Sequence, residues 1–181
     1  MRTPPSFVHD IEFSVVGEWM RSNVLAMPWV NVTHVLCVTF VFGTILIVDL
    51  RLLDLLDRGR AVTKVANEML HLTWAAFAGA VLTGAMFFSA NATTYWFNNE
   101  FRFKMLAILL AGVNMAAFHF TTYRSVAGWD RNATTPRAAK VASALSLLIW
   151  IAVVVLGRLI GFTKGFDVTL PDNVNFDFGT P

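Results

Sequence analysis

The chain has 181 residues and a formal net charge of +2, and hydrophobic residues make up 56% of it while charged residues make up only 14%. An ordinary soluble domain carries about 25% charged residues, so the charges of this chain are too few to cover a water-exposed surface. The composition therefore excludes a soluble domain and indicates an integral membrane protein. The basic residues form no stripe with interleaved aromatic residues, so no nucleic-acid partner is expected.

Residues 1–28 are predicted to form an amphipathic helix on the outer surface of the membrane. Ile11, Val15 and Trp19 repeat at helical spacing, and charged residues such as Asp10 lie elsewhere around the same helix. An apolar stripe opposite charged residues is typical of a helix that lies in the plane of the membrane interface.

Four later segments are each apolar over about 20 residues, the length that crosses the hydrocarbon core of a bilayer. Because they are continuously apolar, they predict helices and not the alternating strands of a barrel. The predicted spans are residues 29–50, 72–90, 103–123 and 141–162. Rows of small residues, such as Ala76, Ala80 and Gly84, allow close helix packing. The expected fold is an all-α, four-helix transmembrane bundle.

The tail at residues 163–181 is predicted to be an irregular extramembrane segment. Gly, Pro, Asp and Asn dominate it, and the interleaved aromatic and aliphatic residues follow no helical period. It is more aromatic than a disordered tail usually is. We therefore expect it to rest on the bundle or on a partner subunit.

The distribution of Lys and Arg predicts the orientation, because cytoplasmic connections carry an excess of basic residues. The first and third connections hold Arg51, Arg58, Arg60, Lys64, Arg124, Arg131, Arg137 and Lys140. The termini and the second connection hold fewer, spread over three segments: Arg2, Arg21, Arg102, Lys104, Arg158 and Lys164. Both termini are therefore expected on the periplasmic side of a bacterial inner membrane.

Histidines in the spans are the candidate metal and cofactor ligands, because ionisable groups are costly in a bilayer. His71 at the start of the second span and His119 near the end of the third are expected at the same inner level. Two imidazoles placed in this way can ligate one b-type haem iron. His34, about one turn inside the first span, is a candidate for a separate haem or metal site. Histidines at a membrane boundary are also often interfacial residues, and that reading stays open.

A fourth histidine within the spans is lacking, which excludes a cytochrome with two bis-histidine haems. Three further polar residues are candidates for cofactor contacts. Asn114 is expected to hydrogen-bond to a neighbouring helix, with a cofactor contact as the alternative. Arg51 and Arg158 are candidate partners of haem propionates, although Arg158 can also extend outward to the membrane surface. Asp49 is deep enough to need an ion pair with Arg51 or with a cation on another helix.

The remaining features favour structure over chemistry. The single cysteine, Cys37, cannot form an internal disulfide or a zinc site. No nucleophile elbow, phosphate loop, pair of catalytic carboxylates or HExxH motif is present, so no catalytic residue is assigned. Aromatic residues near the span ends are expected to anchor the bundle at the membrane surfaces. They are Trp29, Trp74, Tyr95, Trp96, Trp129 and Trp150.

Four stretches resemble a family of uncharacterised bacterial four-helix membrane proteins. They are TILIVDLRLLDL (44–55), TWAAFAGAVLTG (73–84), FRFKMLAILLAGVNMAAFH (101–119) and LSLLIWIAVVVLGRLIGF (145–162). The resemblance implies a four-helix fold in a bacterial inner membrane, without an assigned activity. Its motif positions are His34, Asp49, Arg51, Lys104, Asn114, His119 and Arg158. His71 falls where members of the family often carry another residue, which counts against a haem held by His71 and His119.

The leading hypothesis is a membrane subunit of an electron-transfer system. It would bind one b-type haem with axial ligands from His34, His71 and His119, and would exchange electrons with quinone. The alternative is a non-catalytic subunit that anchors a larger complex, with the bilayer and other membrane or periplasmic subunits as partners. Handling of a metal ion or small solute at His34, with Met86 or Met105, is the least favoured reading.

Overall fold

The structure, a computed structural model, describes residues 4–56, 59–130 and 135–163. Over these residues the fold is all-α and contains no strand. Four long helices form the body: α3 (Ala26–Leu52), α4 (Val62–Ala90), α6 (Asn99–Phe120) and α7 (Arg137–Thr163). The predicted tail lies outside the described residues, except for its first residue.

Each of the four long helices is long and apolar enough to cross a membrane, which fits a multi-pass membrane protein. Many of their large apolar side chains face outward, including Leu82, Leu109 and Leu148, which are each about two-thirds exposed. In water such a surface would be an aggregation liability, but in a bilayer it is the expected lipid contact. The four-helix transmembrane fold predicted from the sequence is therefore confirmed.

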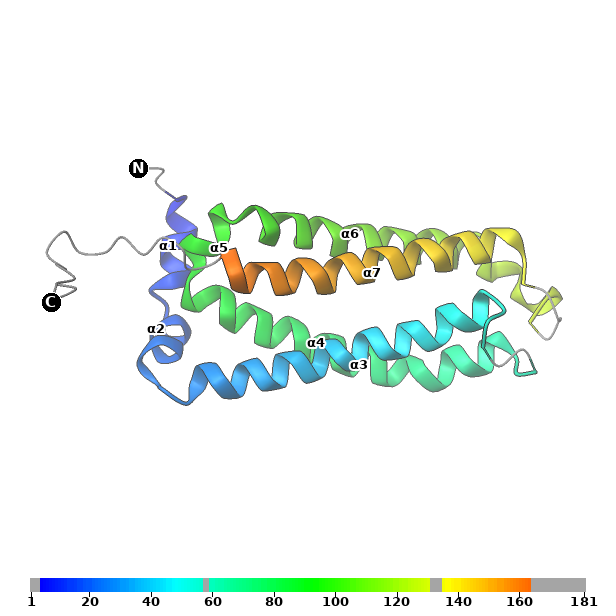
Figure 1. Ribbon diagram of the computed structural model, residues 1–181, viewed down its shortest axis with the longest axis horizontal. Helices are drawn as coiled ribbons and strands as arrows, with labels where there is room; N and C mark the ends of the chain where they lie inside the picture. Colours follow the sequence, from blue (N-terminus) through cyan, green and yellow to red (C-terminus); the bar gives the residue numbers. More distant parts are fainter. Residues whose placement is uncertain (1–3, 57–58, 131–134, 164–181) are drawn as a thin grey trace, which may run out of the picture.

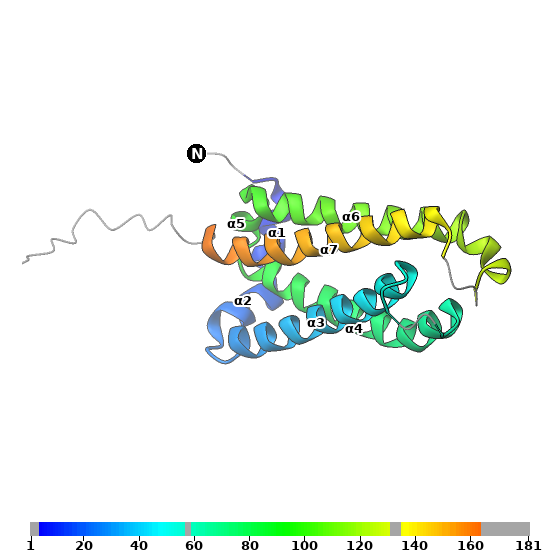
Figure 2. The ribbon, with the colours of Figure 1, turned by 45° about the vertical axis from the view of Figure 1, so that its right-hand side comes forward.

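The long helices form two hairpins, α3 with α4 and α6 with α7, and the hairpins meet mainly where α3 packs against α7 (Figure 1). A second view shows the same two layers (Figure 2). Helices α4 and α6 make no extensive contact with each other along the described chain. One side of the bundle, between α4 and α6, is therefore left without helix–helix packing.

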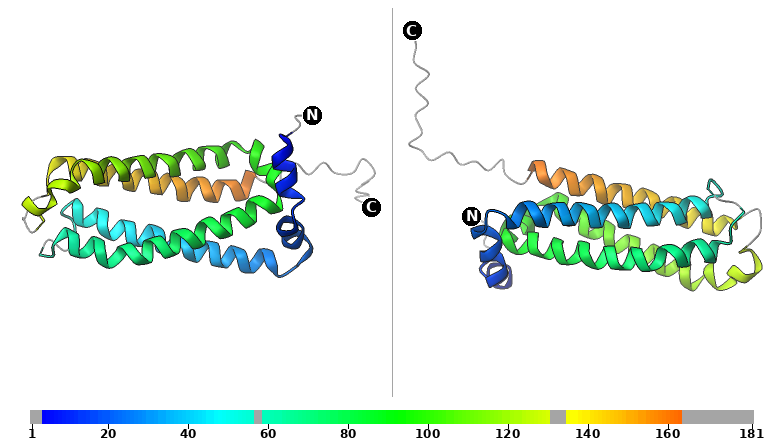
Figure 3. Two further views of the ribbon diagram at one scale, coloured as in Figure 1. Left: turned by 180° about the vertical axis from the view of Figure 1, so that it is seen from behind. Right: turned by 90° about the horizontal axis from the view of Figure 1, so that it is seen from below.

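The short helices α1 (Ser6–Glu12), α2 (Val15–Ser22) and α5 (Ala92–Phe97) gather at one end of the bundle, which we call the terminal end (Figure 3). The opposite end, called the loop end, holds the connection between α3 and α4 and the 3-10 helix η1 (Tyr123–Gly128). The single amphipathic helix expected at residues 1–28 is thus two helices, with the Ser14 side chain capping the second one.

Polar contacts attach α1 and α2 to the terminal end of the bundle. The Arg21 guanidinium donates to the carbonyl oxygens of Glu12, at 2.6 Å, and of Ala90, at 3.1 Å. The backbone N–H of Thr93 donates to the Glu12 carboxylate at 2.7 Å. Because these bonds satisfy the free carbonyls at the end of α4 and a free N–H at the start of α5, they fix the short helices across the bundle end.

Buried apolar side chains form one cluster at each end. Met20, Ala26, Val30 and Ala90 form the cluster of the terminal end. Leu52, Val62, Trp129 and Ala139 form the cluster of the loop end. Trp129, which was predicted to be a membrane-surface anchor, is therefore a core residue, with its indole N–H donating to Ser125 at 3.2 Å.

Helix α4 begins about ten residues earlier than the span predicted from hydropathy. Asp130 explains the difference, because its carboxylate accepts hydrogen bonds from the backbone N–H and the hydroxyl of Thr63 at 2.8 and 2.7 Å. A carboxylate at a helix N-terminus satisfies free N–H groups and complements the helix dipole. As a consequence, His71 lies inside α4 and not at its start.

Candidate functional site

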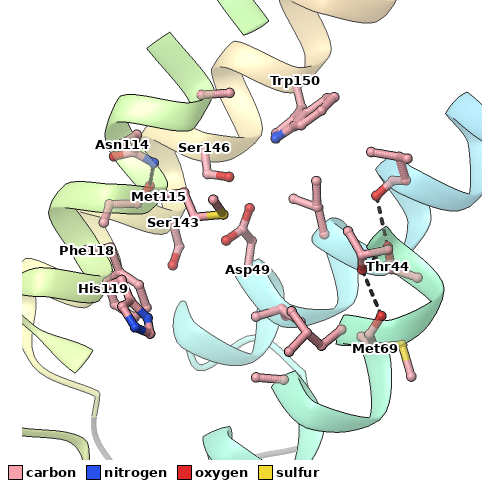
Figure 4. Close-up of a pocket in the computed structure, with 18 of the residues that line it drawn as sticks. Thr44, Asp49, Met69, Asn114, Met115, Phe118, His119, Ser143, Ser146 and Trp150 are labelled. Carbon is pink, nitrogen blue, oxygen red and sulfur yellow. Dashed lines mark hydrogen bonds between the residues drawn. The ribbon is translucent and has the colours of Figure 1, made fainter. Parts of the chain in front are cut away.

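A cavity of about 490 Å³ lies between all four long helices, in the half of the bundle nearer the loop end. Its walls are mainly aliphatic and aromatic, with a small group of polar side chains that converge at one place (Figure 4). Pockets of this size and character commonly bind small molecules.

The polar end of the cavity is formed by Asp49 of α3 and by Ser143 and Ser146 of α7. The Asp49 carboxyl points across the cavity toward the two serines (Figure 4). Its side chain is almost fully buried, and its Oδ2 atom has no hydrogen-bond partner. Such an atom is uncommon in a folded protein, because a buried acceptor without a donor costs about 1–3 kcal/mol, and more when it is charged.

Asn114 lines the same cavity from α6. Its side-chain N–H donates to the carbonyl oxygen of Ala142 on α7 at 2.9 Å, which confirms the helix-to-helix hydrogen bond predicted from the sequence. The bond joins the two helices of the second hairpin. It leaves the amide oxygen of Asn114 as an acceptor near the cavity.

The exposure of the lining residues shows where the cavity opens. Asp49 and Ser143, on α3 and α7, are buried. Leu70 and Trp74 on α4 and Met115 on α6 are each about half-exposed. The opening therefore lies on the side between α4 and α6, which is the side that the lipid acyl chains would meet.

A buried ionic cluster closes the loop end beside the cavity. Lys140 of α7 donates to the Asp54 carboxylate at 2.7 Å, and Thr135 donates to it through its hydroxyl at 2.7 Å and its backbone N–H at 3.2 Å. Burial alone would raise the pKa of Asp54, but the Lys140 ammonium and the Thr135 hydrogen bonds outweigh it and lower the pKa to about 2. This cluster, Asp54 with Lys140 and Thr135, joins the end of α3 to the start of α7.

Arg51 lies at the loop end and does not line the cavity. Its side chain is 1% exposed, its Nε atom donates to the Arg60 carbonyl at 2.9 Å, and its Nη1 atom lies 3.6 Å from Asp54. The expected pair of Asp49 with Arg51 is therefore wrong. Residues two positions apart on a helix point in different directions, whereas Asp54 lies three positions after Arg51.

His34 is held between α3 and α4 in the other half of the bundle, nearer the terminal end. Its Nδ1 atom lies 2.8 Å from the Thr83 hydroxyl oxygen. The Thr83 hydroxyl hydrogen is directed to the Gly79 carbonyl at 2.6 Å, so His34 must be the donor of the bond between them. In the neutral imidazole the lone pair is then on Nε2, the arrangement found in metal-ligating histidines. The cation within electrostatic reach of this ring is Lys104.

The other predicted ligands lie apart. His71 is exposed on α4 and does not line the cavity. His119 lines the cavity at its loop end, where its ring stacks on Tyr123 with ring centroids 5.3 Å apart. Arg158 is exposed near the end of α7 and lies over the Phe162 ring at 4.7 Å. No group of three or more metal-ligating side chains occurs within residues 4–56, 59–130 and 135–163.

Sequence reasoning missed three cavity residues of α7: Ser143, Ser146 and Trp150. Their spacing of three and four residues places them on one face of the helix, which was the available signal. Trp150 was interpreted as a membrane-surface anchor, but it lies at the cavity and turns the nitrogen-bearing edge of its indole toward the open space (Figure 4).

Comparison with known protein families places the chain in a family. A family described only as a family of unknown function (DUF6644) matches residues 14–163, which include all four long helices. No curated protein and no solved structure is significantly similar to the chain.

Proposed function

The chain belongs to this family of unknown function, and we propose that it is a membrane subunit of an electron-transfer system that binds a quinone in the four-helix cavity. The observation that carries the proposal is the cavity itself. It is mostly apolar, it opens toward lipid between α4 and α6, and it ends at the buried Asp49 carboxyl.

A quinone matches each of these properties. It has a flat apolar ring for the aliphatic and aromatic walls, oxygen atoms for the polar end, and a lipid-soluble chain. A ligand of this kind enters from the bilayer, and its chain can stay among the lipids through the opening between α4 and α6. The volume of about 490 Å³ lies within the range of about 300–1,000 Å³ usual for small-molecule sites.

The electrons would be exchanged with another membrane or periplasmic subunit. In a bacterial inner membrane with both termini in the periplasm, the cavity would lie in the cytoplasmic half of the bilayer. Helices α1 and α2 would lie on the periplasmic surface, where they would be available to a partner.

A b-type haem is the second candidate, and it is supported by the hydrogen bond between His34 and Thr83. This bond leaves the His34 Nε2 lone pair free for iron. His119 at the cavity is a separate candidate for a single axial ligand. The positions of His34, His71 and His119 give no support to a haem held by two of them together.

Two measurements on protein purified in detergent from its native membrane test these proposals. Organic extracts should contain quinone in near-stoichiometric amount. Gly112→Leu should abolish its recovery, because Gly112 lines the cavity, where a leucine side chain would fill space, and a Cβ added there meets no atom within 4 Å. Gly161→Leu is the matched control, since a Cβ added at Gly161 also meets no atom within 4 Å and Gly161 does not line the cavity.

The second measurement is a reduced-minus-oxidised absorption spectrum. A b-type α-band that disappears in His34→Ala or His119→Ala would establish the haem and identify its ligand. A chain that carries neither quinone nor haem, and that co-purifies with other subunits, would be an anchoring subunit, and the electron-transfer proposal would fail.

A further inference from the structure

Two of the hydroxyl groups around the cavity already direct their hydrogen atoms to carbonyls of their own helices. Thr44 donates to the Phe40 carbonyl at 2.9 Å, and Ser143 donates to the Ala139 carbonyl at 2.9 Å. A hydroxyl carries only one hydrogen, so these two groups present only acceptor lone pairs to a ligand.

Asp49 adds the strongest acceptor. Its side chain is 6% exposed, and its Oδ2 atom is buried without a donor. The nearest cation in the sequence, Arg51, is bound to the Arg60 carbonyl and to Asp54 and is turned away. The Ser146 hydroxyl hydrogen-bonds to the carboxyl, so Oδ2 is the oxygen that lacks a donor, and in a low-dielectric site it needs one from the ligand.

The cavity also offers a donor close to Asp49. Trp150 turns its indole N–H toward the same space, and Ser146 lies beside the carboxyl (Figure 4). The Ser146 hydroxyl already hydrogen-bonds to the Asp49 carboxyl, so the Trp150 N–H is the donor that is left for a ligand. A ligand group that fits here must therefore donate to the Asp49 Oδ2 atom and accept from Trp150.

A hydroxyl is the group that does both. We propose that the cavity selects the reduced, hydroxyl-bearing form of its ligand, a hydroquinone, whose ring hydroxyl donates to Asp49 and accepts from the Trp150 N–H. A quinone carbonyl can only accept, so it would leave the Asp49 Oδ2 atom without a donor. This inference rests on the proposed function and adds to it the form of the ligand and its orientation.

The test compares two forms of one probe on the purified wild-type chain. A short-chain benzoquinone and its hydroquinone are titrated under anaerobic conditions in detergent, and binding is followed by calorimetry. The hydroquinone should bind at least about tenfold more tightly, since an unpaired charged acceptor costs more than one ordinary hydrogen bond. This comparison requires no variant, so misfolding cannot obscure it.

Asp49→Asn then tests the assigned residue. A side-chain amide both donates and accepts, so the difference between the two forms should shrink toward equality, mainly through tighter binding of the quinone. Asp10→Asn, the same substitution at an exposed carboxylate of α1, should leave the ratio unchanged.

The possible failures are distinguishable. Quinone binding that equals or exceeds hydroquinone binding would overturn this inference but leave the proposed function intact, and would mean that Asp49 carries a proton and donates it. An unchanged ratio in Asp49→Asn would remove Asp49 from the selection. Failure of both forms to bind would refute the proposed function itself.

Discussion

Replacement of Asp54 by Asn tests whether the buried ionic cluster holds the two hairpins together beside the cavity. Asp54 has a positive φ of 60°, a conformation that Asn adopts about as readily as Asp, so the substitution changes the charge and not the backbone. The variant loses the charge attraction to the Lys140 ammonium, which then faces a neutral side-chain amide.

The magnitude follows from the burial of the partners. Removal of one member of a buried ion pair typically costs about 3–5 kcal/mol. The Asp54 side chain is only 6% exposed, but that of Lys140 is 38% exposed, so water screens part of the interaction. Thr135 can still donate to the Asn oxygen. We therefore expect the lower end of the range, a loss of about 3 kcal/mol in the free energy of unfolding.

The assay is chemical unfolding in mixed micelles, followed by far-ultraviolet circular dichroism. The matched control is Glu68→Gln, which removes the partner of Arg60 at the same end of the bundle. Both side chains of that pair are about 40% exposed, so its loss should cost less than about 1 kcal/mol. Equal losses in the two variants would refute the claim that the buried cluster is the stabilising one.

The pH dependence gives an independent check. The pKa of Asp54 is about 2 in the folded chain, against an ordinary value of 3.8. Because the folded-state pKa is lowered, the stabilisation is fully present above the ordinary pKa and is lost as the pH falls through the folded-state pKa. The difference in the free energy of unfolding between wild type and Asp54→Asn should therefore be constant from pH 7 to 5 and should shrink below pH 4, toward pH 2. A difference that shrinks already near neutral pH would contradict the assignment.

Three further predictions follow from local contacts. Gly17→Ala should destabilise the chain by about 1–3 kcal/mol in the same unfolding assay, because the added Cβ would lie 2.6 Å from the Ser89 carbonyl oxygen at the end of α4. The control Gly43→Ala places its Cβ in open space and should not destabilise the chain. Asp49→Asn should stabilise the ligand-free chain by about 1–3 kcal/mol, because it replaces a buried carboxyl whose Oδ2 atom has no donor. A loss of stability would show that the hydrogen bond from Ser146 to the carboxyl outweighs that cost. Thr83→Val should remove the acceptor of the His34 Nδ1–H, so nitrogen NMR of the imidazole should show signals of the Nε2–H tautomer. An unchanged spectrum would refute the assigned tautomer.

The spans were predictable because hydrophobicity over about 20 residues is a local property of the sequence. The start of α4 was not, because its cap comes from Asp130, far along the chain. The helix-to-helix hydrogen bond of Asn114 was predictable from its depth alone, since a side-chain amide inside an apolar helix needs a partner.

Whether His71 and His119 come into contact could not be predicted in the same way. Their similar level follows from the order of the helices, but a contact between them would require α4 and α6 to pack together. The structure instead joins the hairpins through α3 and α7. Which sides of a four-helix bundle close depends on side-chain shapes that hydropathy does not record.

Asp49 distinguishes this bundle from a purely structural one. Thr44 and Ser143 are buried around the same cavity, but each hydroxyl bonds to a carbonyl of its own helix, so both are tolerated at little cost. Among the described residues, two buried side-chain atoms lack a hydrogen bond, Arg51 Nη1 and Asp49 Oδ2. The first lies 3.6 Å from the Asp54 carboxylate, and the second has no such compensation.

An aliphatic residue at position 49 would pack against α7 without leaving an unpaired carboxyl, so the fold alone does not account for the aspartate. Departures of this kind are expected where a protein binds or reacts with something. The unpaired oxygen faces a cavity that opens toward lipid, and for that reason we assign the function to a lipid-soluble ligand that donates a hydrogen bond.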